Sequence, residues 1–153
     1  MAKPELNVDP GMFLEYIDES LDMLFEVEKL LVELEQNPSN LEIINTVFRP
    51  IHTIKGNSSF FELLKVKKLS HELETLLDLI RKNKIDLSKE LVSILLRGTD
   101  KLKTMFTLSA RAISSLLTRR ATIKSSKRFR KSQRPATLSR ASFGTLHLPL
   151  SAN

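Results

Sequence analysis

Residues 48–61 of the chain read FRPIHTIKGNSSFF. This stretch sets one histidine, His52, into an apolar pattern typical of a helix, with Lys55 three residues later and Gly56 four residues later. Positions i, i+3 and i+4 of a helix lie on one face. The stretch therefore predicts a helix with an apolar face toward a core and a small polar surface made of His52, Lys55 and Gly56.

Two residues of this helix are unfavourable for it. Pro50 removes a backbone hydrogen bond and costs about 3 kcal/mol in a free helix interior. Gly56 costs about 1 kcal/mol relative to alanine. Packing must offset both penalties, which indicates that the site around His52 tolerates or needs these residues.

Apolar periodicity predicts four helices and no strand within residues 1–106. The predicted helices cover about 10–37, 39–59, 65–82 and 88–106. Asp9 and Pro10 start the first helix, since aspartate caps free amides and proline is tolerated at the first helical position. Ser39 with Glu42 forms a capping box for the second, and either Asp86 or Ser88 caps the fourth after a turn.

The inward faces of the four helices follow from the same periodicity. The predicted core residues are Phe13, Ile17, Leu21, Leu24, Leu31, Leu34, Leu41, Ile44, Phe48, Ile51, Phe60, Phe61, Leu69, Leu73, Leu76, Leu77, Ile80, Leu91, Ile94, Leu95, Leu102 and Met105. Helices with short connections pack most simply as neighbours. We therefore expect an all-α fold, an antiparallel up-down-up-down four-helix bundle.

Composition excludes several classes of function. The chain has 153 residues and no cysteine, which excludes disulfides, thiolate metal sites and cysteine nucleophiles. Its four glycines are too few and too scattered for a glycine-rich phosphate loop. The N-terminus lacks a signal-peptide pattern and no apolar run is long enough to span a bilayer, so we expect a soluble cytoplasmic protein.

Charge divides the chain. Residues 1–106 have a net charge of −4, whereas residues 107–153 contain no acid and have a net charge of +10. We expect a flexible N-terminus over 1–9, the bundle over 10–106 and a basic tail over 107–153. Within the tail, Thr107–Leu117 either extends the last helix or forms a weak fifth one, and disorder is expected from Thr118 onward.

The third helix places two polar residues where they can face His52. His71 and Glu74 are three residues apart and so share a face. A carboxylate that accepts the proton on Nδ1 leaves Nε2 of an imidazole bare and raises its basicity. Glu74 is the candidate orienting group, and Lys55 supplies positive charge where phosphoryl oxygens develop negative charge. Gly56 leaves space for an incoming active site, so the residues together predict a phosphoryl acceptor.

These residues resemble a known family. The segment His52-Thr53-Ile54-Lys55-Gly56, followed by an H-x-x-E pattern at His71 and Glu74, is similar to the histidine phosphotransfer (HPt) domain of the CheA family of chemotaxis kinases, over about residues 10–106. The resemblance implies an antiparallel helical bundle. It also implies that His52 is phosphorylated, that Glu74 orients it, and that Lys55 and His71 complete a hydrogen-bonded site.

The resemblance also implies partners. The chain has no ATP-binding domain of that family, so a separate histidine kinase catalytic domain would phosphorylate it in trans. An aspartate of a CheY-like response regulator would then receive the phosphoryl group. The domain itself would need no cofactor or metal, because ATP and Mg²⁺ belong to the partners. Whether such a domain counts as an enzyme stays open, and a monomer is expected because the family's dimerising segment is absent.

Other interpretations stay open for several of these residues. A lone helix histidine is usually a solvated surface residue, and His71 is as easily structural as mechanistic. The alternative function is a non-catalytic helical interaction module whose basic run, Lys124–Arg134, binds nucleic acid or an acidic membrane surface. A merely solvated tail is favoured over either, since Phe129 is the run's one aromatic residue. The tail is a truncated or frame-shifted end or a genuine appendage.

Overall fold

The structure, a computed structural model, describes residues 8–38 and 40–132. Four helices account for most of them: α1 (Pro10–Gln36), α2 (Leu41–Phe60), α3 (Leu64–Arg81) and α4 (Lys89–Ser132). The described ranges contain no strand. The predicted all-α class is confirmed, and the helix bounds agree with the predicted ones to within a few residues except at the end of α4.

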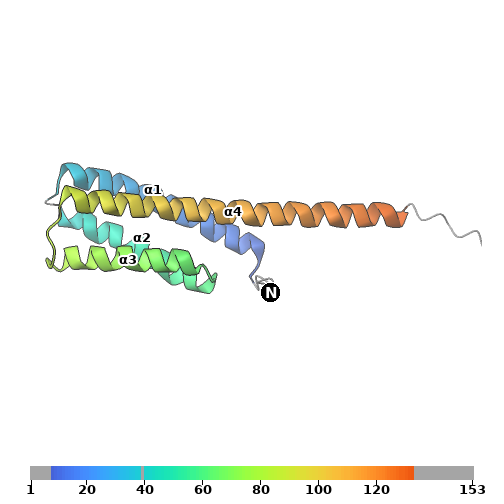
Figure 1. The fold of residues 1–153 in the computed structure, drawn as a ribbon, viewed down its shortest axis with the longest axis horizontal. Helices are drawn as coiled ribbons and strands as arrows, with labels where there is room; N and C mark the ends of the chain where they lie inside the picture. Colours follow the sequence, from blue (N-terminus) through green and yellow to red (C-terminus); the bar gives the residue numbers. More distant parts are fainter. Residues whose placement is uncertain (1–7, 39, 133–153) are drawn as a thin grey trace, which may run out of the picture. The chain divides into compact units, whose positions relative to one another are not determined.

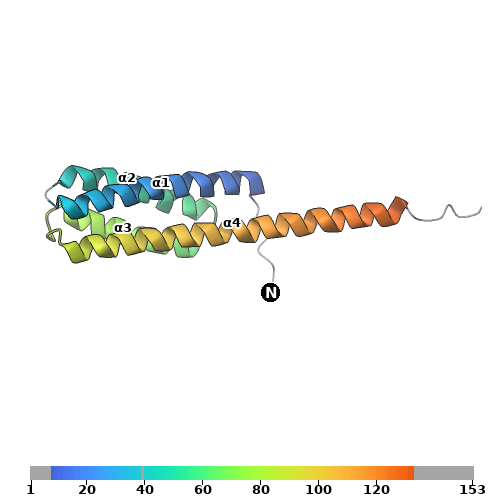
Figure 2. The same cartoon turned by 90° about the horizontal axis from the view of Figure 1, so that it is seen from above.

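The four helices form an antiparallel bundle (Figures 1 and 2). Successive helices run in opposite directions, so that α2 lies beside α1 and α3, and the first part of α4 closes the bundle against α1 and α3. The connections are short, as the up-down-up-down topology requires. Glu62, in the connection between α2 and α3, has a left-handed φ of 55°.

Side chains cap three of the helices. The carboxylate of Asp9 accepts a hydrogen bond from the Met12 amide at 3.0 Å, and the hydroxyl of Ser88 accepts one from the Leu91 amide at 3.2 Å. These contacts confirm Asp9 as the cap of α1 and show that Ser88, rather than Asp86, caps α4. The cap of α2 is Asn40, whose Oδ1 accepts from the Glu42 amide at 3.2 Å. The predicted cap, Ser39, lies outside the described residues.

Apolar side chains from all four helices fill the core. Most predicted core positions are buried or half-buried, but Leu41, Phe60 and Ile94 are exposed. Phe60 is wrong as a core residue because its neighbour Phe61 takes the inner position, stacked on Tyr16 with ring centroids 4.5 Å apart. The sequence interpretation also missed a set of buried residues: Tyr16, Val27, Ile43, Val47, Ile54, Val66, Val92 and Phe106.

Contacts from α1 fix the inner side of α2 opposite His52. The hydroxyl of Tyr16 donates to the carbonyl of Ile54 at 3.2 Å. The Tyr16 ring also meets Phe106 of α4 edge-on at 5.7 Å. Ile54 is itself fully buried, so this face of α2 is pinned while His52 and Lys55 point away from it.

Gly98 lets α4 approach α3 closely. A Cβ at position 98 would lie 2.5 Å from Cδ2 of Leu73, a buried side chain of α3. Such a contact is far inside the ordinary van der Waals distance of about 3.5–4.0 Å. The glycine thus allows Leu73 to fill the space between the helices, one residue before Glu74.

Disorder from Thr118 onward is wrong for residues 118–132, which are the helical end of α4 with exposed side chains. No glycine or proline interrupts the chain between Gly98 and Pro135, and the arginine and lysine that are frequent in residues 118–132 favour helix. Of the two options for Thr107–Leu117, the structure has the extension of the last helix. The compact unit that holds the bundle ends at Ser114, and a functional division at residues 106 and 107 stays a prediction.

Within residues 8–38 and 40–132, none of the helices combines the length and apolar character that crossing a bilayer would require.

Candidate functional site

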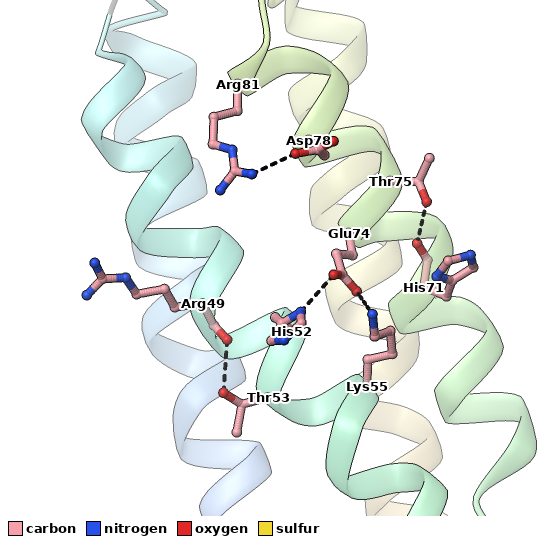
Figure 3. Close-up of polar contacts among 9 residues, drawn as sticks. All are labelled: Arg49, His52, Thr53, Lys55, His71, Glu74, Thr75, Asp78 and Arg81. Atoms are coloured by element: carbon pink, nitrogen blue, oxygen red, sulfur yellow. Dashed lines mark hydrogen bonds and ion pairs between the residues drawn. The ribbon is translucent and has the colours of Figure 1, made fainter.

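His52 lies on the outer face of α2, and its ring reaches toward α3 (Figure 3). Its Nδ1 lies 2.7 Å from Oε1 of Glu74 on α3. The His52 side chain is nevertheless 61% exposed, against 13% for Glu74. One edge of the imidazole is therefore tied to the protein while the rest of the ring is open to a visiting molecule.

Lys55 pairs with the second oxygen of the same carboxylate. Its Nζ lies 2.6 Å from Oε2 of Glu74, so that Glu74 binds both α2 side chains at once (Figure 3). Burial by itself raises the pKa of Glu74, but the hydrogen bonds and charges of Lys55 and His52 outweigh it and leave the pKa below its usual value. Glu74 is accordingly a carboxylate at neutral pH.

An ionised Glu74 decides which nitrogen of a neutral His52 carries the proton. A carboxylate only accepts hydrogen bonds, so Nδ1 must donate. The lone pair then resides on Nε2, which does not face Glu74. The arrangement produces an exposed nitrogen nucleophile with a fixed tautomer.

Gly56 is exposed one turn after His52. A Cβ built at this position would meet nothing within 4 Å. Packing within the described chain therefore gives no steric reason for a glycine here, although the residue is poor in a helix. That Gly56 keeps the surface beside His52 clear for a partner's active site stays a prediction.

His71 lies on α3 one turn before Glu74 and is exposed. Its carbonyl accepts a hydrogen bond from Thr75 at 2.9 Å, but in the described part of the chain its ring forms neither a hydrogen bond nor an ion pair with His52, Lys55 or Glu74. The structure thus brings together three of the four predicted site residues. A role for His71 stays a prediction.

The sequence interpretation missed two residues that approach the site from the end of α3. Arg81 places its guanidinium carbon 4.3 Å from the centroid of the Phe48 ring, and Nη2 of Arg81 binds Oδ1 of Asp78 at 2.7 Å. Phe48 in turn stacks on His52. Helical spacing was the signal available in the sequence. Asp78 lies four residues after Glu74 on α3, and His52 lies four residues after Phe48 on α2, so the members of each pair share a helix face.

An exposed histidine, held at Nδ1 by a carboxylate of the next helix and carried on an antiparallel four-helix bundle, defines the class of histidine phosphotransfer domains. Comparison with known families agrees: residues 12–112 match the Hpt domain. The chain belongs to the Hpt domain family.

The curated relatives include chemotaxis kinases. The chain is 37% identical over 91 residues to the sensor histidine kinase CheAY of Helicobacter pylori. The aligned part covers 60% of the chain and 11% of the relative. It is 33% identical over 98 residues to the chemotaxis protein CheA of Borreliella burgdorferi, covering 64% of the chain and 11% of the relative. The matched part thus spans about a tenth of these relatives' length.

Solved structures give the same fold. The CheA phosphotransferase domain from Thermotoga maritima has 31% sequence identity and a TM-score of 0.62, covering 66% of this chain and 96% of that one. The phosphorylated P1 domain of CheA3 in complex with CheY6 from R. sphaeroides has 29% sequence identity and a TM-score of 0.64, and the match covers 68% of this chain and 81% of that one. The chain is therefore an Hpt domain homologous to the CheA P1 phosphotransferase domain.

Proposed function

We propose that His52 is the phosphoacceptor of this domain, that a histidine kinase catalytic domain phosphorylates it in trans from ATP, and that it passes the phosphoryl group to an aspartate of a CheY-like response regulator. The observation that carries the proposal is the 2.7 Å contact between Nδ1 of the exposed His52 and Oε1 of Glu74. The partners are supported by the solved relative, a phosphorylated P1 domain in complex with CheY6.

In the accepting step, the Nε2 lone pair of His52 attacks the γ-phosphorus of ATP held by the kinase. The N–P bond forms, the P–O bond to the β-phosphate breaks, and ADP leaves with the electron pair. Nδ1 keeps its proton, so the imidazole gains positive charge as the bond forms. The carboxylate of Glu74 is already in place to stabilise that charge without reorganisation.

In the donating step, a carboxylate oxygen of the response regulator attacks the same phosphorus. The N–P bond breaks and its electron pair returns to Nε2, which regenerates neutral His52 with the proton still on Nδ1. Mg²⁺ and ATP are supplied by the partner proteins in this scheme. In this chain His52 carries the phosphoryl group, Glu74 orients the ring and stabilises its charge, and Lys55 supplies positive charge for the phosphoryl oxygens.

The proposal is tested with the wild-type chain, a CheA-type kinase catalytic domain and labelled ATP. We expect acid-labile label on this chain, followed by loss of the label to a CheY-type regulator when that protein is added. A matched regulator whose phosphorylated aspartate is replaced by asparagine is the control and should leave the label in place. Absence of label on the wild-type chain with kinases that phosphorylate their own P1 domains would contradict the proposal.

Gly56→Ala should separate stability from function. Since the new methyl group meets no atom within 4 Å, we expect the free energy of unfolding to rise by about 1 kcal/mol, the difference in helix propensity. Phosphoryl transfer should nevertheless slow, because the methyl group stands on the surface that the partner's active site approaches. Urea denaturation and the transfer assay measure the two effects. A stabilised variant that transfers at the wild-type rate would show that the glycine does not serve partner access.

A further inference from the structure

A second restraint acts on His52 besides Glu74. The rings of Phe48 and His52, one turn apart on α2, are inclined by 16° with their centroids 5.9 Å apart. Glu74 fixes the position of Nδ1 at the edge of the imidazole. Phe48 lies alongside the plane of the ring.

The two restraints limit different motions. The terminal torsion of histidine, χ2, is broad and has no sharp staggered minima. A single hydrogen bond at Nδ1 holds one atom of the ring but lets the plane rock, and with it the direction of the Nε2 lone pair. A nearly parallel aromatic neighbour restricts that rocking, because tilting the imidazole would break the favourable offset-stacked contact between the two rings.

Phe48 is itself held in place from α3. The Arg81 guanidinium lies over the Phe48 ring at 4.3 Å, within the range of a cation–π contact. Asp78 binds that guanidinium at 2.7 Å and also pairs with Lys82 at 2.6 Å. The hydrogen bonds from Lys82, against a smaller effect of burial, keep the pKa of Asp78 below its usual value, so it stays an anion at neutral pH.

Resting on the proposed phosphoacceptor role of His52, we propose that Phe48 and Arg81 are positioning residues for phosphoryl transfer. Arg81 holds the Phe48 ring, and the Phe48 ring holds the plane of the His52 imidazole so that Nε2 points in the direction of attack. Glu74 and Asp78, one turn apart on α3, thus serve the same ring by two routes. Glu74 does so directly, and Asp78 acts through Arg81 and Phe48.

Two variants test the proposal in the full chain. Phe48→Leu keeps an apolar side chain but removes the ring, and we expect the rate of phosphorylation by a CheA-type kinase domain to fall about tenfold, since small displacements of a reacting group can cost up to about a hundredfold. Arg81→Ala should lower the rate less. Because Arg81 acts through Phe48, the double variant should be no slower than Phe48→Leu alone, and Phe48→Tyr should restore the rate.

Phe60→Leu is the matched control. Phe60 is also an aromatic residue of α2, but it is 64% exposed and touches Phe61 rather than His52. We expect this variant to be phosphorylated at the wild-type rate. A rate for Phe48→Leu equal to that of Phe60→Leu would overturn the proposal. So would additive effects of the Phe48 and Arg81 variants, which would mean that Arg81 acts on the phosphoryl group independently of Phe48.

NMR of the unphosphorylated protein separates this proposal from the proposed function. In Phe48→Leu, the carbon-bound protons of His52 should lose the ring-current shift that the Phe48 ring causes. The side-chain order parameters of His52 should also fall. The nitrogen shifts should still report a proton on Nδ1, because Glu74 is unchanged. Unaltered order of the His52 ring would overturn the positioning role. If instead wild type takes no label while the NMR changes occur, the phosphoacceptor role fails and the restraint of the ring stands.

Discussion

His52→Gln is expected to take up no phosphate from a CheA-type kinase domain and ATP. Glutamine at position 52 can still reach the carboxylate of Glu74, so the bundle should fold as before. Its amide nitrogen, however, has no lone pair available for attack on phosphorus. The measurement is acid-labile label on the purified chain, with the circular dichroism spectrum and thermal midpoint compared with those of wild type.

The second histidine of the bundle supplies the control for this result. His71 is on the neighbouring helix, exposed and without a hydrogen bond of its ring to the site. His71→Gln should therefore still be labelled, and the label should be on His52. Persisting acid-labile phosphate on His52→Gln would reject His52 as the acceptor, and its loss from His71→Gln alone would move the assignment to His71.

Glu74→Ala is expected to slow phosphorylation by about ten- to a hundredfold, which is the cost found when a metal-binding histidine loses the group that orients it. Without the carboxylate, Nδ1 no longer holds the proton preferentially, and part of the population presents a protonated Nε2. The charge that develops on the ring also loses its partner. Single-turnover kinetics with saturating kinase domain measure the chemical step apart from binding.

Glu72→Ala is the matched comparison for Glu74→Ala. Glu72 is an exposed glutamate of the same helix, two residues away, and forms none of the recorded ion pairs of the described residues. The Glu72→Ala variant loses the same charge as Glu74→Ala but leaves the surroundings of His52 unchanged. It should therefore be phosphorylated at nearly the wild-type rate. Equal slowing in both variants would indicate a general effect of charge on kinase binding and would remove the orienting role from Glu74.

Glu74 also links the stability of the bundle to pH. Its pKa is lower in the folded than in the unfolded chain, because Lys55 and His52 more than offset the effect of burial. The stability that this carboxylate contributes is therefore fully present above the ordinary glutamate pKa of about 4.3 and is lost as the pH falls through the lower, folded value. Glu74→Ala should show a smaller loss of stability than wild type between about pH 5 and pH 3.

Much of this site was predictable because helical spacing converts sequence into position. His52, Lys55 and Gly56 share a face for reasons that any straight helix imposes, and His71 and Glu74 share another. Which of the latter two reaches His52 depends on the rotation of α3 about its axis. That rotation is set by the packing of Val66, Leu73 and Leu77 and by the close approach at Gly98, which spacing alone does not provide.

The residues that were missed depend on tertiary structure in the same way. Arg81 contacts Phe48 across 33 positions of sequence, through an antiparallel arrangement that places the end of α3 beside the first half of α2. Phe60 and Phe61 show a finer limit: two adjacent aromatic residues at a helix end fit the apolar pattern equally well, and the ring of Tyr16 selects Phe61. For the basic segment after Thr118, disorder was predicted because its composition has too few apolar residues to form a core. Helix propensity is a local property, however, and does not require a core.

Both halves of the His52–Glu74 contact come from a single helical hairpin, 22 positions apart in the chain. The two side chains of this contact therefore both lie in the run from Leu41 to Arg81, whereas α1 and the first part of α4 pack against that hairpin and hold it in place. Substitutions on their solvent-facing sides should therefore leave the imidazole and its carboxylate in place.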